Sequence, residues 1–261
     1  MFQAYCINLK RRTDRWEYMQ NVSRSGGFRL KRVDALDASL HSSTEEISQI
    51  KKRGPTGVLG QAALACVVSH ARAWQEFLSS GESYGVILED DVIISDDFSK
   101  TIIHLIDRWP ELDLIKLECG GSALSGLLLG RQLSTYRGRN LRECFQVSTD
   151  AAGYILSRSG AETALRNLRD CDVGVDHYLF YPIPRKGCAG IRFGMVEPAI
   201  LIQDRNLKSD ITNARYEDRT ATRRIKRVFY EVSPAPYMMR KLLSGARFMK
   251  TPFQNAVGDA I

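Results

Sequence analysis

Short apolar runs alternate along this chain with segments of helical periodicity, and this alternation constrains the fold more than any other feature. Residues 2–9 (FQAYCINL) and 84–88 (YGVIL) are apolar runs rich in strand-forming side chains. Between them, residues 61–79 space apolar side chains three and four positions apart, as in a helix that packs on one face. Strands that alternate with helices predict an α/β fold, in which helices cover both faces of a sheet.

The same patterns predict the remaining elements. Further strands are expected at residues 30–34, 113–117, 152–156 and 197–202, the last of which closes the sheet, and further helices at 13–25, 97–108, 159–168 and 176–181. Thr13 and Ser159 are expected to cap two of these helices. Residues 37–60 are polar and predict a long loop with a helical turn near 44–52, and residues 119–142, rich in Gly, Ser and Arg, predict another loop.

Length and composition fit a folded domain with a tail. The chain has 261 residues, of which 44% are apolar and 26% charged, so it can bury a core without cross-links. None of its six cysteines forms a C-x-x-C pair, which favours reduced, buried thiols in a cytoplasmic protein. No run approaches the roughly 20 apolar residues that span a bilayer, so any membrane contact is expected to be peripheral.

Positive charge is concentrated near the end of the chain. The net charge is +7, and residues 212–261 contain ten Lys or Arg against four Asp or Glu. We therefore expect a nearly neutral domain, 1–211, and a basic amphipathic tail with helical character, 212–261. Such a tail can lie on the anionic cytoplasmic face of the inner membrane, or it can be a solvated face packed on the domain. Nucleic-acid binding is a further alternative, which the neutral body disfavours.

Three acids, Glu89, Asp90 and Asp91, directly follow the apolar run 84–88. Adjacent carboxylates repel one another unless a cation lies among them, and hard ions such as Mg²⁺ or Mn²⁺ prefer carboxylate oxygens. The end of a strand in an open α/β sheet is also where ligands bind. The sequence therefore predicts a metal site here. The alternative is a solvated acidic loop, with Asp90 or Asp91 capping the next helix.

Two further groups of polar residues are candidates for chemistry. Arg11, Arg12 and Arg15 follow the first strand and could bind a nucleotide diphosphate at a helix start, with Asn8 reading a base edge. The alternative is a solvated helix start in which Asp14 pairs with a neighbouring arginine. Further along, Asp176 could act as a general base and His177 as a metal ligand, or the pair could simply begin a helix.

Five stretches, taken together, resemble glycosyltransferase family 25, the lipooligosaccharide galactosyltransferase group to which collagen galactosyltransferases are related. They are INLKRRTDRW, ALACVVSHARAW, VILEDDV, AGYILSRSGAETAL and VDHYLF, which occur in the family's order within about residues 2–211. The resemblance implies a GT-A-like mixed sheet flanked by helices. It also implies an inverting transfer, usually of galactose from UDP-galactose, that a divalent metal, Mn²⁺ or Mg²⁺, assists.

Residue roles follow from this resemblance by position. Glu89, Asp90 and Asp91 match the family's metal-binding acids; we assign Glu89 and Asp91 to the metal, with His177 as a further ligand, and Asp176 as the catalytic base. The residues expected to bind the nucleotide sugar are Asn8, Arg12, Arg15, Asp34, Ser69, His70, Asp90, Ser209 and Asp210. For His70, a purely structural role in the core is the alternative.

One stretch departs from the family pattern, which has Gly-x-x-Gly-Cys before Ser-His. Here Ala62 and Ala65 precede Cys66, and Ala63 stands where an acid is usual. Alanine keeps the helix but adds methyl groups where a backbone has to approach a ligand closely. The acceptor therefore stays open, and a degenerate member that binds nucleotide or glycan without turnover is an alternative.

The sequence thus predicts a metal-dependent hexosyltransferase. We expect it to transfer a hexose, with galactose as the first candidate, from a UDP-sugar to a glycan or lipid-linked oligosaccharide of lipopolysaccharide biosynthesis. We expect no nucleic-acid partner. A nucleotidyltransferase, which also places clustered carboxylates on Mg²⁺, is the alternative among enzymes.

Overall fold

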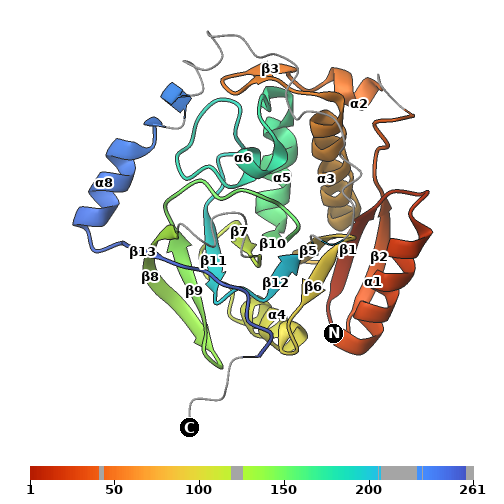
Figure 1. The fold of residues 1–261 in the computed structure, drawn as a ribbon, viewed down its shortest axis with the longest axis horizontal. Helices are drawn as coiled ribbons and strands as arrows, with labels where there is room; N and C mark the ends of the chain where they lie inside the picture. Colours follow the sequence, from red (N-terminus) through yellow and green to blue (C-terminus); the bar gives the residue numbers. More distant parts are fainter. Residues whose placement is uncertain (41–43, 119–125, 205, 207–227, 231, 257–261) are drawn as a thin grey trace.

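A nine-stranded mixed sheet forms the centre of the computed structural model, which describes residues 1–40, 44–118, 126–204, 206, 228–230 and 232–256. The strand order is β13-β8-β9-β11-β7-β10-β5-β1-β2 (Figure 1). The strands are β1 (Gln3–Asn8), β2 (Arg29–Asp34), β5 (Tyr84–Glu89), β7 (Leu114–Lys116), β8 (Leu127–Tyr136), β9 (Arg139–Cys144), β10 (Gly153–Ser157), β11 (Phe193–Glu197) and β13 (Arg247–Met249). Two small sheets pair β12 (Leu201–Gln203) with β6 (Val92–Ile94), and β3 (Arg53–Gly54) with β4 (Gly57–Val58).

Helices cover both faces of this sheet, as the alternating pattern predicts. On β1, Tyr5 and Ile7 belong to one core cluster together with Trp74, whereas Ala4 and Cys6 belong to another together with Met19. Successive strand residues point to opposite faces, so each strand feeds two cores. The first core contains residues of α3 (Gln61–Ser79), α5 (Arg158–Asn167) and α6 (Val175–Leu179), and the second contains residues of α1 (Thr13–Gly26) and α4 (Phe98–Asp107).

The parallel strands β2, β1 and β5 set the position of the polar residues that follow them. Asn8 pairs in register with Asp34, and Ile7 pairs with Glu89. The carboxyl ends of these three strands therefore meet at one edge of the sheet, where α/β proteins bind ligands. The helix α3 packs against β1, β2 and β5 beside that edge (Figure 1).

Two expectations about strands are wrong. Residues 127–144, expected for the most part as a loop, form the β8–β9 hairpin, because Arg137 and Gly138 both have positive φ (48° and 79°) and so make the tight turn that hairpins prefer. The expected strand 197–202 does not close the sheet: β11 ends at Glu197, and β12 pairs with β6 instead. Pro198 separates the two strands because it has no N–H to donate to a ladder.

Two expected helix caps also differ from the structure. Thr13 is the first residue of α1, and the N-cap is Arg12, with no side-chain capping bond. In α5 the cap is Ser157 rather than Ser159, and its hydroxyl accepts the backbone N–H of Gly160 at 3.0 Å. The short α2 (Glu45–Ser48) lies where the sequence predicts a helical turn, and the Thr44 hydroxyl caps it.

The end of the chain returns to the body. After α8 (Ala235–Leu243), β13 pairs with β8, and the backbone N–H of Ala199 donates to the carbonyl of Pro252. Arg139, almost fully buried, donates to both carboxylate oxygens of Asp97 and to the carbonyl of Gln254. Residues 207–227 lie outside the described residues. They include the expected domain boundary at 211, the expected site residues Ser209 and Asp210, and the basic cluster from Arg219 to Arg227. None of the helices described here has the length and apolar character that crossing a membrane requires.

Candidate functional site

A cleft of about 220 Å³ lies at the carboxyl edge of β1, β2 and β5. The helix α3 forms one wall, the loop after β2 another, and the acids after β5 and Gln203 of β12 complete it. The lining residues that contribute polar or charged groups are Arg11, Arg15, Asp37, Ser39, Gln61, Cys66, Ser69, His70, Glu89, Asp90, Asp91 and Gln203. Most of these follow strands that meet at this edge or lie on the inward face of α3.

The three adjacent acids divide into two roles. Asp90 is buried, and its carboxylate accepts the guanidinium of Arg15 at 2.8 Å and the side-chain amide of Asn8 at 2.6 Å. Arg15 and Asn8 are themselves buried. Because a buried carboxylate needs a partner of this kind, Asp90 is compensated by the protein and ties the ends of β1 and β5 to α1.

Glu89 and Asp91 instead converge on one amide group. The side-chain nitrogen of Gln203 donates to Glu89 Oε2 at 3.3 Å and to both oxygens of Asp91 at 3.2 Å. Burial and the charge of Glu89 raise the pKa of Asp91 to about 7, although Arg15 lowers it. The guanidinium of Arg15 also lies 3.4 Å from Asp91 Oδ2, a long contact. Three carboxylate oxygens around a single amide donor fit the ligand set of a hard divalent cation. The metal implied by the sequence is therefore compatible with Glu89 and Asp91.

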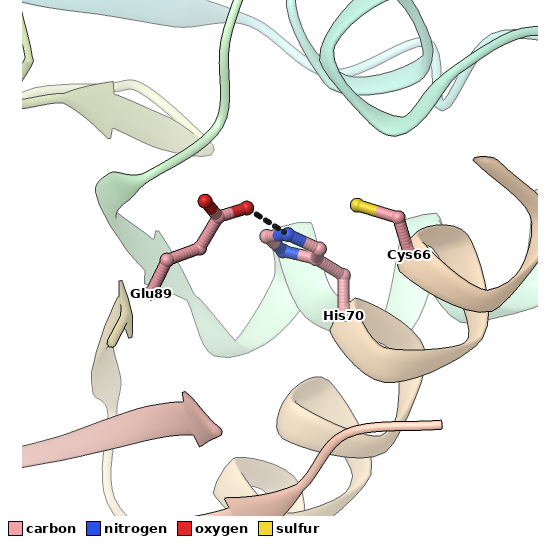
Figure 2. Close-up of side chains that lie close together, drawn as sticks. All are labelled: Cys66, His70 and Glu89. Carbon is pink, nitrogen blue, oxygen red and sulfur yellow. Dashed lines mark hydrogen bonds and ion pairs between the residues drawn. The ribbon is translucent and has the colours of Figure 1, made fainter. Parts of the chain in front are cut away.

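His70 connects this pair of acids to the core. Its Nδ1 is hydrogen-bonded to the Tyr154 hydroxyl at 2.8 Å, and that hydroxyl accepts the indole N–H of Trp74 at 2.8 Å. On its other side, Nε2 faces Glu89 Oε1 at 3.4 Å (Figure 2). Burial lowers the pKa of His70 to about 4, so the ring is neutral at neutral pH. His70 therefore has a defined orientation in the core and still reaches the cleft.

Cys66 lies one helical turn before His70 and points toward the same place (Figure 2). The ligand atoms of Cys66, His70 and Glu89 all lie within 4.8 Å of one another. In the part of the chain that the structure describes, this is the only group of three or more His, Cys, Asp or Glu side chains that meets this condition. The expected ligand His177 does not belong to it.

Three of the described residues expected to bind the nucleotide, Asn8, Arg12 and Asp34, lie outside the cleft lining. Arg12 pairs with Asp14, with a nitrogen–oxygen distance of 2.7 Å, as the alternative interpretation of the helix start predicts. Asp34 is exposed beside Arg32, at 3.7 Å. The arginines that line the cleft are Arg15, as expected, and Arg11, which donates to Asp37 at 2.7 Å.

Ser69 lines the cleft but is engaged in holding its wall together. Its hydroxyl accepts the backbone N–H of Leu36 at 2.9 Å and donates to the carbonyl of Ala65 at 2.7 Å. The loop after β2 is thereby fixed to α3. Ser69 thus shapes the cleft through the backbone of both elements.

Asp176 and His177 lie on α6 and are not among the residues that line the cleft. The Asp176 carboxylate accepts the backbone N–H of Asp150 at 3.3 Å and that of His177 at 2.8 Å. His177 Nδ1 is hydrogen-bonded to the hydroxyl of Tyr230 at 2.9 Å. These contacts join α6 to the loop before β10 and to the segment after the basic region.

A buried ion pair also holds that loop. The Lys116 ammonium donates to Glu118 Oε1 at 2.8 Å and to the carbonyls of Thr149 and Asp150 at 2.9 and 2.5 Å. Both side chains of the pair are almost completely buried. Glu118 also accepts the N–H of Ala152, whose carbonyl accepts the N–H of Glu89. The pair thus positions the backbone of a cleft acid.

Comparison with known proteins assigns the chain to a family. Its sequence matches the family described as Glycosyltransferase family 25 (LPS biosynthesis protein) over residues 1–179. The chain belongs to glycosyltransferase family 25. One similar protein is the lipooligosaccharide biosynthesis protein lic2B of Haemophilus influenzae, 24% identical over 78% of this chain and 76% of that protein. Another is the human procollagen galactosyltransferase 2, 28% identical over 43% of this chain but 19% of the human one.

Solved structures give a weaker likeness. A glycosyltransferase involved in glycosylating the major capsid of PBCV-1 aligns with 87% of this chain and 98% of its own, at 8% identity and a TM-score of 0.42. The family assignment therefore depends on the sequence match.

Two of the three alanines expected to depart from the family pattern lie at the cleft of this family 25 chain. Ala62 and Ala65 both line it, whereas Ala63 packs against the core. The methyl groups of Ala62 and Ala65 therefore take space beside Cys66 and Ser69.

The sequence interpretation missed Gln203, Tyr154 and Asp37 as residues of the site or its support. Gln203 directly follows the apolar residues 201–202, so the rule that selects Glu89 after 84–88 would also have selected it. Tyr154 lies inside a buried strand and carries no such signal.

Proposed function

We propose that this chain is an inverting glycosyltransferase that transfers a hexose from a UDP-sugar to a glycan acceptor of lipopolysaccharide or lipooligosaccharide type. Galactose is the first candidate for the hexose. The names of the similar proteins support the sugar and the acceptor class. The observation that carries the proposal is the convergence of Glu89 and Asp91 on one point of a cleft at the carboxyl edge of the sheet.

In this proposal Glu89 and Asp91 hold Mn²⁺ or Mg²⁺, and Gln203 gives up its bonds to them. When bound, the metal would neutralise charge on the diphosphate of the departing UDP. Asp90 keeps its bonds to Arg15 and Asn8, so its role is to fix the position of the two neighbouring acids. Arg11 lines the cleft and adds positive charge for an anionic ligand.

The contacts of Asp176 favour a positioning role over the expected role of base. A general base has to come within hydrogen-bond reach of the acceptor hydroxyl. Asp176 is buried outside the cleft lining and accepts two backbone N–H groups. We therefore propose that it holds the loop 148–152, through which Ala152 positions Glu89.

A donor screen that measures UDP release tests the function. We expect release with one UDP-hexose and an acceptor extract, dependent on Mn²⁺ or Mg²⁺. Release of pyrophosphate in place of UDP would indicate a nucleotidyltransferase. Tight UDP binding without release from any donor would identify a member without turnover, and either result would reject the proposal.

We also propose a peripheral membrane contact through α8 and β13. The apolar side chains of Met239, Leu243 and Phe248 are exposed, by 58%, 84% and 55%. The basic residues Arg240, Arg247 and Lys250 lie exposed among them, and the residues from 235 to 250 contain no acid. Exposed apolar groups among cations suit an anionic lipid surface, where a lipid-linked acceptor would be found.

Point substitutions test this contact better than truncation, because β13 is a strand of the main sheet. A Met239→Glu, Leu243→Glu variant should lose co-sedimentation with anionic vesicles while keeping its melting temperature. An Ile103→Glu variant, altered at an exposed apolar residue of α4, should sediment like the wild type. Equal sedimentation of all three proteins would exclude α8 as the contact.

A further inference from the structure

Three chemically different metal-binding groups meet on one wall of the cleft. Cys66 and His70 are four residues apart on α3, so their side chains lie on the same face of the helix. Glu89 approaches the same place from the end of β5 (Figure 2). Sulfur, imidazole nitrogen and carboxylate oxygen come within 4.8 Å of one another.

We propose that Cys66, His70 and Glu89 form a binding site for zinc, separate in chemistry from the Mn²⁺ or Mg²⁺ site of Glu89 and Asp91. Thiolate and imidazole ligands suit zinc, whereas Mn²⁺ and Mg²⁺ prefer oxygen ligands. All three residues line the cleft. A set of three protein ligands beside open space resembles zinc sites that keep one position for water or an exchangeable ligand.

The orientation of His70 is already that of a metal ligand. Ligating histidines are held by a hydrogen bond at the ring nitrogen that does not bind the metal. Here Nδ1 has that bond, to the Tyr154 hydroxyl at 2.8 Å, and Tyr154 is fixed in turn by Trp74. In the tautomer with the proton on Nδ1, Nε2 presents its lone pair toward Glu89 and Cys66.

Binding would cost the site little existing structure. Between His70 and Glu89 the cation would replace the long contact of 3.4 Å from Nε2 to Oε1, which is a hydrogen bond only in the tautomer with the proton on Nε2; binding therefore selects the other tautomer. Asp90, Arg15 and Asn8 keep their bonds, since none involves the three ligands. Because Glu89 is a ligand in both proposed sites, zinc should compete with Mn²⁺. This competition rests on the proposed function, whereas the zinc site itself does not.

Cobalt substitution tests the site directly. The full chain, stripped of metal by a chelator, is titrated with Co²⁺ and followed by absorption. We expect one equivalent to bind with a thiolate-to-cobalt charge-transfer band in the near ultraviolet. Cys66→Ser should lose the band and weaken Zn²⁺ binding more than about tenfold. Cys144→Ser, which alters a buried thiol of β9 outside the cleft, should keep both.

A second measurement needs no variant and therefore no assumption about folding. Zn²⁺ should protect Cys66 of the wild-type chain from alkylation, as mass spectrometry of the peptides would show. Saturation with Co²⁺ without a thiolate band, a band that persists in Cys66→Ser, or equal alkylation of Cys66 with and without Zn²⁺ would each overturn the site. None of these readouts requires a sugar donor or turnover, so a chain without transferase activity still tests it.

Discussion

The buried pair of Lys116 and Glu118 allows a quantitative prediction. In Lys116→Met the ammonium disappears, which leaves the Glu118 carboxylate and the carbonyls of Thr149 and Asp150 without that donor. Removing one partner of a buried ion pair costs about 3–5 kcal/mol, because the other charge stays buried and uncompensated. At roughly 2–4 °C per kcal/mol for a domain of this size, the melting temperature should fall by about 10 °C.

The loss should depend on pH in a defined direction. Burial raises the pKa of Glu118 to about 7 from 4.5, and Lys116 lowers it, so removing Lys116 raises it further. An acid whose pKa is higher in the folded state loses stability as the pH rises above its unfolded value. The stability difference between variant and wild type should therefore grow as the pH rises above about 7, where Glu118 ionises in the wild type but stays protonated in the variant.

Urea unfolding followed by tryptophan fluorescence measures both effects. The matched control is Lys116→Met combined with Glu118→Gln, since glutamine is uncharged and can still accept the N–H of Ala152. The double variant should recover most of the lost free energy. A loss under about 1 kcal/mol in the single variant, or no recovery in the double variant, would refute the reasoning.

Three further predictions concern the cleft. Asp176→Asn should keep kcat within about tenfold, whereas a hundredfold loss at unchanged KM and melting temperature would make Asp176 the general base after all. Ala62→Gly and its control Ala63→Gly should each cost up to about 1 kcal/mol of stability. Only Ala62→Gly should change the KM for the donor. Equal KM values in the two variants would show that the Ala62 methyl group does not contact the donor. Burial lowers the pKa of His70 from 6.5 to about 4, so as the pH falls the unfolded chain binds this proton before the folded chain does. The free energy of unfolding should therefore drop by roughly 3 kcal/mol between pH 6.5 and pH 4. An equally steep drop in His70→Gln would show that another group is responsible.

The sequence predicts the elements that have strong local signals. The predicted bounds of α3 agree with the structure, because the buried residues Leu64, Val68, Ala71 and Trp74 follow one another at intervals of three or four. The strand before Glu89 is equally clear, since an apolar run passes directly into acids. The β8–β9 hairpin was missed because its turn, Arg137-Gly138, stands in a region whose glycines and serines also suit a loop.

The site was harder to predict because it depends on orientation and long-range pairing. Arg11, Arg12 and Arg15 are chemically alike, and only the direction in which each points decides that Arg15 reaches Asp90 while Arg12 pairs with Asp14. Gln203 reaches the acids because β12 pairs with β6, a contact between segments about a hundred residues apart. The three acids are adjacent and alike in the sequence, and only the folded arrangement separates Asp90, paired with Arg15 and Asn8, from Glu89 and Asp91, which converge on Gln203.

Mn²⁺ binding, measured by titration together with UDP release, tests whether Glu89 and Asp91 hold the metal that the transfer requires. Asp91→Ala should lose both the Mn²⁺ affinity and the transfer, whereas Asp107→Ala, which removes an exposed acid of α4, should keep both. Near-normal turnover of Asp91→Ala in the presence of Mn²⁺ would contradict the account.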